Sequence, residues 1–178
     1  MLTFGMPVYN QEGELGKLSG IVIDPRNRTV QWLIVSRRGF LWDEDSRLIA
    51  PKSITAQTKQ GLHLNQTKWD FSVSRRYIRM SDRHVGVPLD MVVLSPRTPV
   101  HGVDGLIGRL RGIELDAEHR QLTRLLIKGE WILGRDWIVP AAWADVLNDE
   151  EIHLNRSRRE IRNDSSQPTS IAHASSQA

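Results

Sequence analysis

Arginines are the residues of this sequence whose spacing most directly indicates a binding function. They form two clusters, which consist of Arg75, Arg76, Arg79 and Arg83 in the middle of the chain and of Arg156, Arg158, Arg159 and Arg162 near its end. Guanidinium groups pair with carboxylates and phosphates. Both clusters are therefore candidate contacts for a protein partner, for RNA or for an anionic membrane surface.

Aromatic side chains accompany the first cluster and give it two interpretations. Trp69, Phe71 and Tyr77 are interleaved with its arginines. On an exposed segment the rings would stack on bases while the arginines bind phosphates. In the alternative, the rings pack on the flank of a domain and the arginines keep their charged ends in water. No known RNA-binding motif accompanies the charge, which favours the second interpretation.

Sequence patterns typical of catalysis or of cofactor binding are not found. The glycines of Gly13–Lys17 are too close together for a phosphate-binding loop, and no nucleophile elbow occurs. His63 and His153 recur at matching positions between aliphatic residues, which predicts outward-facing strand residues rather than metal ligands. Asp24 and Asp116 are expected to accept backbone hydrogen bonds in turns. We therefore expect no enzymatic activity, no cofactor and no metal.

The composition is that of a soluble protein with a modest core. Hydrophobic residues make up 39% of the 178 residues, and the formal net charge is +3. There is no cysteine, which excludes disulfides and thiolate metal sites. No apolar segment approaches the roughly 20 residues needed to cross a bilayer, and the first residues lack the features of a secretory signal. These observations predict a cytoplasmic protein without a transmembrane segment.

The elements that must position these residues follow from an internal repeat. The segment GELGKLSGIVID at Gly13–Asp24 returns without a gap as GLIGRLRGIELD at Gly105–Asp116, and the offset is 92 positions (105 − 13). Solenoid repeats have units of about 20–50 residues. The longer period here therefore indicates a duplicated domain.

Each copy has the pattern of a series of short β-strands. Alternating aliphatic residues in Gly13–Asp24 and the β-branched segment Thr29–Ser36 predict a hairpin. Pro51 ends a later strand, and Pro140 is its apparent counterpart in the second copy. Short strands without a long helical pattern predict an all-β fold of two tandem small barrels, each closed around its own aliphatic interior.

The order of these motifs resembles that of the PRC-barrel domain family. The first copy carries its motifs at Pro7-Val8, Gly13, Gly16-Lys17, Ile21–Asp24, Leu33–Val35 and Ile49–Pro51. The second copy carries them at Pro99-Val100, Gly105, Gly108-Arg109, Ile113–Asp116, Leu125–Ile127 and Ile138–Pro140. The resemblance implies two PRC-type β-barrels in tandem.

The same resemblance implies an interaction module rather than an enzyme. PRC-barrels occur in the cytoplasmic part of the photosynthetic reaction-centre H subunit and in a ribosome maturation factor. The first protein has a membrane helix that is not expected here, and the second pairs one PRC-barrel with a different barrel. The resemblance therefore favours a protein-binding or assembly role. RNA or ribosome association and a peripheral membrane complex are the alternatives.

The repeat predicts a division of the chain into four segments. These are a first PRC-barrel domain at residues 1–68, a basic connector at 69–94, a second PRC-barrel domain at 95–162 and a disordered tail at 163–178. The tail is rich in Ser, Gln and Ala and has almost no large apolar residue. Such a segment has too little apolar surface to offset the entropy of folding.

Overall fold

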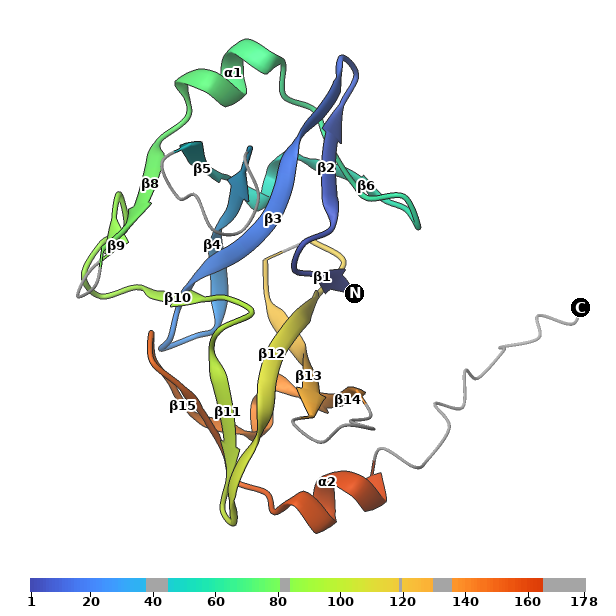
Figure 1. Cartoon of the computed structure of the whole chain (residues 1–178), viewed down its shortest axis with the longest axis vertical. Helices are drawn as coiled ribbons and strands as arrows, with labels where there is room; N and C mark the ends of the chain where they lie inside the picture. Colours follow the sequence, from blue (N-terminus) through green and yellow to red (C-terminus); the bar gives the residue numbers. More distant parts are fainter. Residues whose placement is uncertain (38–44, 81–83, 119, 130–135, 165–178) are drawn as a thin grey trace, which may run out of the picture.

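The computed structural model describes residues 1–37, 45–80, 84–118, 120–129 and 136–164, which form mostly β-structure (Figure 1). The elements up to the connector are β1 (Leu2–Thr3), β2 (Pro7–Asn10), β3 (Gly13–Asp24), β4 (Thr29–Ser36), β5 (Ser46–Ile49), the 3-10 turn η2 (Pro51–Ser53), β6 (Ile54–Gln57) and β7 (Leu62–Leu64). The connector contributes α1 (Lys68–Val73), β8 (Arg76–Arg79), β9 (His84–Val85) and β10 (Val92–Leu94). The second half contains β11 (Pro99–Gly102), β12 (Gly105–Leu115), β13 (Leu122–Gly129), β14 (Asp136–Pro140), η3 (Ala141–Trp143), β15 (Ala144–Leu147), β16 (Ile152–Leu154) and α2 (Arg158–Asp164).

Two sheets with the same strand order make up the described part of the chain. The first runs β6-β7-β2-β3-β4-β5-β8-β9, and the second runs β15-β16-β11-β12-β13-β14. In both sheets two long antiparallel strands form a hairpin, which is β3–β4 in the first and β12–β13 in the second. A parallel pair joins β2 to β7 in the first sheet and β11 to β16 in the second. The prediction of an all-β fold is confirmed. The pair β8–β9 extends the first sheet and has no counterpart among the described strands of the second.

The two 3-10 turns correct the alignment of the halves. η2 begins at Pro51, but η3 begins at Ala141, although Pro140 directly precedes it. The strand pairing also makes Ile49 and Val139 equivalent. Ile49 pairs with Leu33 of β4 and Val139 pairs with Leu125 of β13, and these two leucines lie 92 positions apart. The predicted equivalence of Pro51 and Pro140 is therefore wrong by one position. A proline is compatible both with a strand end and with the first residue of a turn, so its presence alone does not fix the register.

The halves exchange a short strand with one another. β1, which precedes the first copy, pairs with β12 of the second sheet, so that Leu2 faces Ile113. β10, which precedes the second copy, pairs with β3 of the first sheet, so that Leu94 faces Ile21. Leu94 lies 92 positions after Leu2, and Ile113 lies 92 positions after Ile21 (94 − 2 and 113 − 21). The exchange is therefore reciprocal, and each sheet is completed by a strand from outside its own copy.

Glycine is required on both long strands where the exchanged strand approaches. A Cβ atom added at Gly20 would lie 2.9 Å from the carbonyl oxygen of Leu94. A Cβ atom added at Gly112 would overlap the carbonyl oxygen of Leu2. Gly20 and Gly112 are equivalent in the repeat, so the same close approach explains both.

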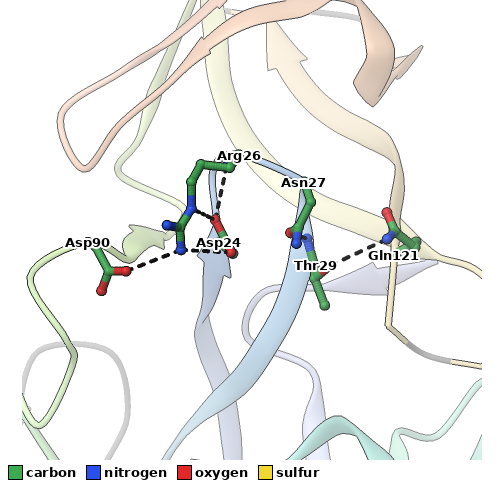
Figure 2. Close-up of polar contacts among 6 residues, drawn as sticks. All are labelled: Asp24, Arg26, Asn27, Thr29, Asp90 and Gln121. Carbon is green, nitrogen blue, oxygen red and sulfur yellow. Dashed lines mark hydrogen bonds and ion pairs between the residues drawn. The ribbon is translucent and has the colours of Figure 1, made fainter.

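A second reciprocal contact joins the tips of the two long hairpins. Thr29 and Gln121, which are equivalent in the repeat, form a β-bridge and a side-chain hydrogen bond of 3.4 Å (Figure 2). The Val30 N–H donates to the Arg120 carbonyl at 2.6 Å, and the Leu122 N–H makes the corresponding bond in the opposite direction at 3.1 Å. Equivalent residues of the two copies therefore face each other at this point.

The core is shared between the halves. One cluster of buried side chains contains Val8 and Leu33 from the first sheet, Val100 and Leu125 from the second, and Phe71 from α1. The prediction that each copy encloses its own interior is therefore wrong. The physical reason is the strand exchange, which carries apolar side chains of each copy into the other.

The C-terminal helix begins with a reciprocal cap. The Ser157 N–H donates to the Glu160 carboxylate at 2.7 Å, and the Glu160 N–H donates to Ser157 Oγ at 3.3 Å. The Ser157 N–H and the Ser157 hydroxyl both donate to the Glu160 carboxylate and hold its pKa below the usual value. The helix runs to Asp164, whereas the sequence places the start of the tail at residue 163. The rest of the predicted tail, residues 165–178, lies outside the described residues.

Neither α1 nor α2, the α-helices of the described ranges, is long and apolar enough to cross a bilayer.

Candidate interaction surface on the connector

The connector covers the outer face of the first sheet. Tyr77 of β8 and Val93 of β10 are buried against Val22, Ile34 and Leu48, and these five side chains form a second, smaller core. Figure 1 shows β8, β9 and β10 following one another along this side of the sheet. The connector is thus part of the folded body and not a solvated tether.

The second sheet has a different outer face at the equivalent positions. Val22 faces Trp32 across the first hairpin, and both pack in the smaller core. The residues 92 positions later are Glu114 and Arg124, which also face each other and form an ion pair of 3.4 Å. One copy is therefore built to be covered on this side, and the other is built to face water.

Helix α1 presents part of its surface to solvent. Phe71 is buried in the shared core, whereas Trp69 is 73% exposed and Val73 is exposed as well. Residues four apart lie on the same side of a helix, so Trp69 and Val73 share one face. Thr67 and Asp70 fix the start of the helix through a capping box. The tryptophan is therefore held outward by a firmly anchored turn.

The β8–β9 hairpin and the turn after it expose further apolar side chains. Met80 directly after β8 and Val85 on β9 are exposed, and Leu89 is 100% exposed. Together with Trp69 and Val73, these are five of the eight large hydrophobic side chains that are exposed in the described part of the chain. Sequence reasoning missed Val73, Met80, Val85 and Leu89 as surface residues. A usable signal was present for Met80, Val85 and Leu89, because they lie between α1 and β10, in a segment without a counterpart among the described residues of the second half.

Three arginines of the first predicted cluster lie on this segment. Arg75, Arg76 and Arg79 are all exposed, and Arg76 and Arg79 belong to β8. The carbonyl of Arg75 accepts the Leu48 N–H at 2.8 Å, which ties its backbone to the first sheet. Arg83 lies outside the described residues. We call the exposed side chains of Trp69, Val73, Arg75, Arg76, Arg79, Met80, Val85 and Leu89 the connector surface.

The described acidic residues of the connector are already bonded within the fold. The Asp70 carboxylate accepts the Thr67 N–H at 3.1 Å and the Thr67 hydroxyl at 2.7 Å, and these bonds lower the pKa of Asp70. Asp90 lies 3.2 Å from the guanidinium of Arg26, which also binds Asp24 (Figure 2). Hydrogen bonding from Arg26 lowers the pKa of Asp24. Among its described residues, the connector therefore combines exposed apolar side chains with three exposed arginines and one ionised carboxylate that is not paired with a cation, that of Asp70.

The structure separates the second arginine cluster into internal and external members. Arg156 stacks over Trp143 with 5.3 Å between its guanidinium carbon and the ring centroid, and it donates to the Asn155 carbonyl at 2.9 Å. Arg158 donates to the Leu106 carbonyl at 2.5 Å. Arg159 and Arg162 are exposed on α2, at the opposite end of the molecule from α1 (Figure 1). The two predicted clusters therefore do not form one surface.

The recurring histidines lie on the parallel strand pairs. The ring of His63 stacks on Tyr9 at 5.6 Å, and the ring of His153 stacks on His101 at 5.2 Å. The Glu151 carboxylate lies 2.9 Å from Nε2 of His153 and 3.4 Å from Nε2 of His101, and the hydrogen bond from His153 is the main cause of a lowered Glu151 pKa. Within the described ranges, no group of three His, Asp or Glu side chains is arranged to hold a metal ion.

The predicted turn aspartates have the expected partners. Asp24 Oδ1 accepts the Arg26 N–H at 3.0 Å, and Asp116 Oδ1 accepts the N–H groups of Arg120 and Gln121 at 2.8 and 3.1 Å. Both carboxylates are thereby used to close the tips of the long hairpins.

Comparison with protein families gives one match. Residues 4–60 match the family model of the PRC-barrel domain. No curated protein matches the chain. The matched segment contains β2 to β6 and ends before α1, so the connector surface lies outside the matched residues.

Proposed function

We propose that this chain, whose residues 4–60 are a PRC-barrel domain, is a cytoplasmic assembly module that binds a protein partner through the connector surface and has no enzymatic activity. The shared core supplies a rigid body, and the connector supplies the contact. Within the connector, the β8–β9 hairpin and the turn after it have no counterpart among the described residues of the second copy.

One observation carries the proposal: exposed apolar and arginine side chains are concentrated on the connector. Five of the eight exposed large hydrophobic side chains of the described residues lie there, next to three exposed arginines. Aromatic residues, methionine and arginine are the residue types enriched in protein interfaces. Tryptophan and arginine are also the types that most often dominate binding energies. The connector surface therefore has the composition of an interface.

The charge of the connector surface specifies the chemistry of the partner. Its three exposed arginines outnumber the exposed Asp70 carboxylate beside them, and the Asp90 carboxylate pairs with Arg26 of the first hairpin. The surface of the partner should therefore combine an apolar centre with an acidic rim. Such complementarity raises association rates and excludes positively charged competitors.

The test is a pull-down from native lysate with paired variants of the full chain. Trp69→Ser and Arg75→Glu change the connector surface, while Val103→Ser and Arg159→Glu change side chains of the same kinds that are exposed in the second half. Loss of a central tryptophan or arginine contact weakens binding about tenfold or more. We expect the same captured proteins to be lost with both connector variants and kept with both controls, in RNase-treated and untreated samples.

Other results would contradict this proposal in distinct ways. Equal loss with Val103→Ser or Arg159→Glu would place the contact outside the connector. Capture that disappears after RNase treatment would favour the RNA alternative. Binding to anionic but not to neutral vesicles, with no protein retained, would favour the peripheral membrane alternative. Turnover that survives repurification and is abolished by one point mutation would refute the absence of enzymatic activity.

A further inference from the structure

The two sheets differ in what lies beyond β5 and its counterpart β14. On one side β5 pairs with β4, and on the other side it pairs with β8 of the connector. β14 pairs with β13, and no described strand lies on its other side. An unpaired strand edge presents backbone N–H and C=O groups that can pair with another strand. β14 is therefore an open edge of the second sheet.

The first half identifies the backbone groups of β14 that point outward. The Leu48 N–H of β5 donates to the Arg75 carbonyl at 2.8 Å, so it points away from β4. Ile138 is the counterpart of Leu48 in the pairing of β14 with β13. The Ile138 N–H therefore points away from β13, and no described backbone carbonyl accepts it there. An added strand could accept this N–H in the same way as Arg75 accepts that of Leu48.

The same edge exposes an apolar side chain whose counterpart is buried. Leu48 is 4% exposed beside β8, whereas Ile138 is 48% exposed on β14. Leu126, which faces Ile138 across the strand pair, is buried. On the outer face of the second sheet the ion pair of Glu114 and Arg124 is suited to contact with water. Ile138 is instead suited to a cover at the edge.

We propose that the open edge of β14 binds an extended segment of a partner protein, which adds to the second sheet as an antiparallel strand. β8 shows this arrangement within the chain, because it pairs antiparallel with β5 and its Tyr77 packs in the smaller core with Leu48. In strand addition the main chain supplies affinity and alternate side chains supply specificity. The partner segment therefore carries an aromatic or aliphatic side chain that packs on Ile138. This site is separate from the connector surface and does not rest on the function proposed above.

The end of the chain itself lacks the side chain for this role. α1 contacts β5 and α2 contacts β14, and the buried residues of these helices are Phe71 and Ile161. In the first half, Tyr77 follows six residues after Phe71. The residue six positions after Ile161 is Gln167, and Pro168 comes next. A glutamine supplies no apolar cover, and a proline has no N–H for the ladder. These differences favour a separate protein as the occupant.

The test is a titration of the ¹⁵N-labelled full chain with a blocked synthetic peptide that has the sequence of Ser74–Arg79. We expect saturable shifts at the amides of Asp136 and Ile138 and slower hydrogen exchange at Ile138. Two N-methylated peptides of the same charge serve as controls, because successive N–H groups of a strand point to opposite sides. Methylation of the tyrosine amide should weaken binding about tenfold, as expected for one lost hydrogen bond. Methylation of the isoleucine amide should leave binding unchanged.

A matched pair of variants tests the contribution of the exposed side chain. Ile138→Ser removes the apolar contact and should weaken peptide binding about tenfold or more. Val146→Ser is the control, because Val146 is 44% exposed on β15, the strand at the other end of the same sheet. It should bind the peptide as the parent chain does. Trp69→Ser, which changes the connector surface, should also bind normally, so this test is independent of the pull-down.

Several results would overturn the proposal. Shifts that do not saturate, that occur on β5 instead of β14, or that are equal for the two methylated peptides would each refute strand addition at this edge. Binding by a chain that ends at Asp164, but not by the full chain, would assign the edge to the last residues of the chain itself. A dimer in sedimentation with slow exchange at Ile138 before any peptide is added would assign it to a second copy. If Ile138→Ser failed to fold, the methylated peptides would still decide, since they act on the unchanged chain.

Discussion

Replacing Leu94 by alanine tests whether the connector completes the core of the first sheet. The side chain is 0% exposed and lies in the core shared by both halves. Removal of three carbon atoms forfeits about 2.4 kcal/mol of transfer free energy at roughly 0.8 kcal/mol for each methylene. The remaining cavity raises the loss to about 3–4 kcal/mol. We therefore expect the free energy of unfolding to fall by this amount.

Urea denaturation followed by tryptophan fluorescence measures the loss. The midpoint should fall while the m-value is unchanged, because the folded shape and the surface exposed on unfolding remain the same. Leu89→Ala is the matched control, since this leucine of the same connector is 100% exposed. Its replacement should alter the free energy of unfolding by no more than about 0.5 kcal/mol.

A single unfolding transition is the second expected result. The core cluster contains residues of both sheets, so the halves should unfold together. Two separate transitions, of which Leu94→Ala shifts only one, would show that the copies are independent domains. A loss below about 1 kcal/mol for Leu94→Ala would refute the structural role of the exchanged strand, because that value is far below the range for buried leucines.

The sequence predicted the elements that depend on local patterns. The two copies of the repeat, Gly13–Asp24 and Gly105–Asp116, contain all of β3 and all of β12, as the alternation of aliphatic residues indicated. The turn aspartates were also assigned correctly, since an Asp side chain accepts hydrogen bonds from amides within its own turn. Such features require only residues that are close in sequence.

The strand exchange was not predictable by the same reasoning. Leu2 and Leu94 are equivalent positions with identical side chains, and each would fit the long strand of either copy. Which strand each one joins depends on the path of the chain between the copies. A β-strand of two or three residues has no periodicity that could decide this.

The difference between the outer faces of the two sheets was predictable from the repeat. Val22 and Trp32 in one copy correspond to Glu114 and Arg124 in the other. This difference predicts a cover over one sheet and water on the other. The connector residues that cover the first sheet can then be distinguished from those that face solvent. Tyr77 and Val93 stabilise the fold, whereas Trp69 and Arg75 are available for binding.

The side-chain partners of the arginines could be identified only from the structure. Arg156, Arg158 and Arg159 are neighbours in one basic segment, and the sequence treats them alike. The first two are bonded to Trp143, Asn155 and Leu106, and only Arg159 of the three is exposed. Charge density along a sequence therefore overstated the size of the second candidate surface.

Three further perturbations test the exchange, the histidine cluster and the difference between the outer faces. Gly112→Ala should destabilise the chain by about 2 kcal/mol in urea denaturation, because the new methyl group would overlap the carbonyl of β1. The Glu151 carboxylate, whose pKa is lowered mainly by its hydrogen bond from His153, should stabilise the fold above its unfolded pKa. That contribution is lost as the pH falls through the lowered folded pKa, and His153→Gln should move the Glu151 pKa upward in a carboxyl NMR titration. Trp32→Arg places the residue of the second copy beneath the connector, where it faces Val22 instead of a glutamate. A charge desolvated without a partner costs about 2 kcal/mol or more, so urea denaturation should show at least that loss and the amides of β8 and β10 should exchange faster with solvent. Adding Val22→Glu restores the pair found in the second copy and should recover part of the loss, since the two charges then compensate each other. If Val22→Glu brought no recovery in the Trp32→Arg chain, the outer faces would differ for a reason other than the cover, and the connector would lose its assigned role in the fold.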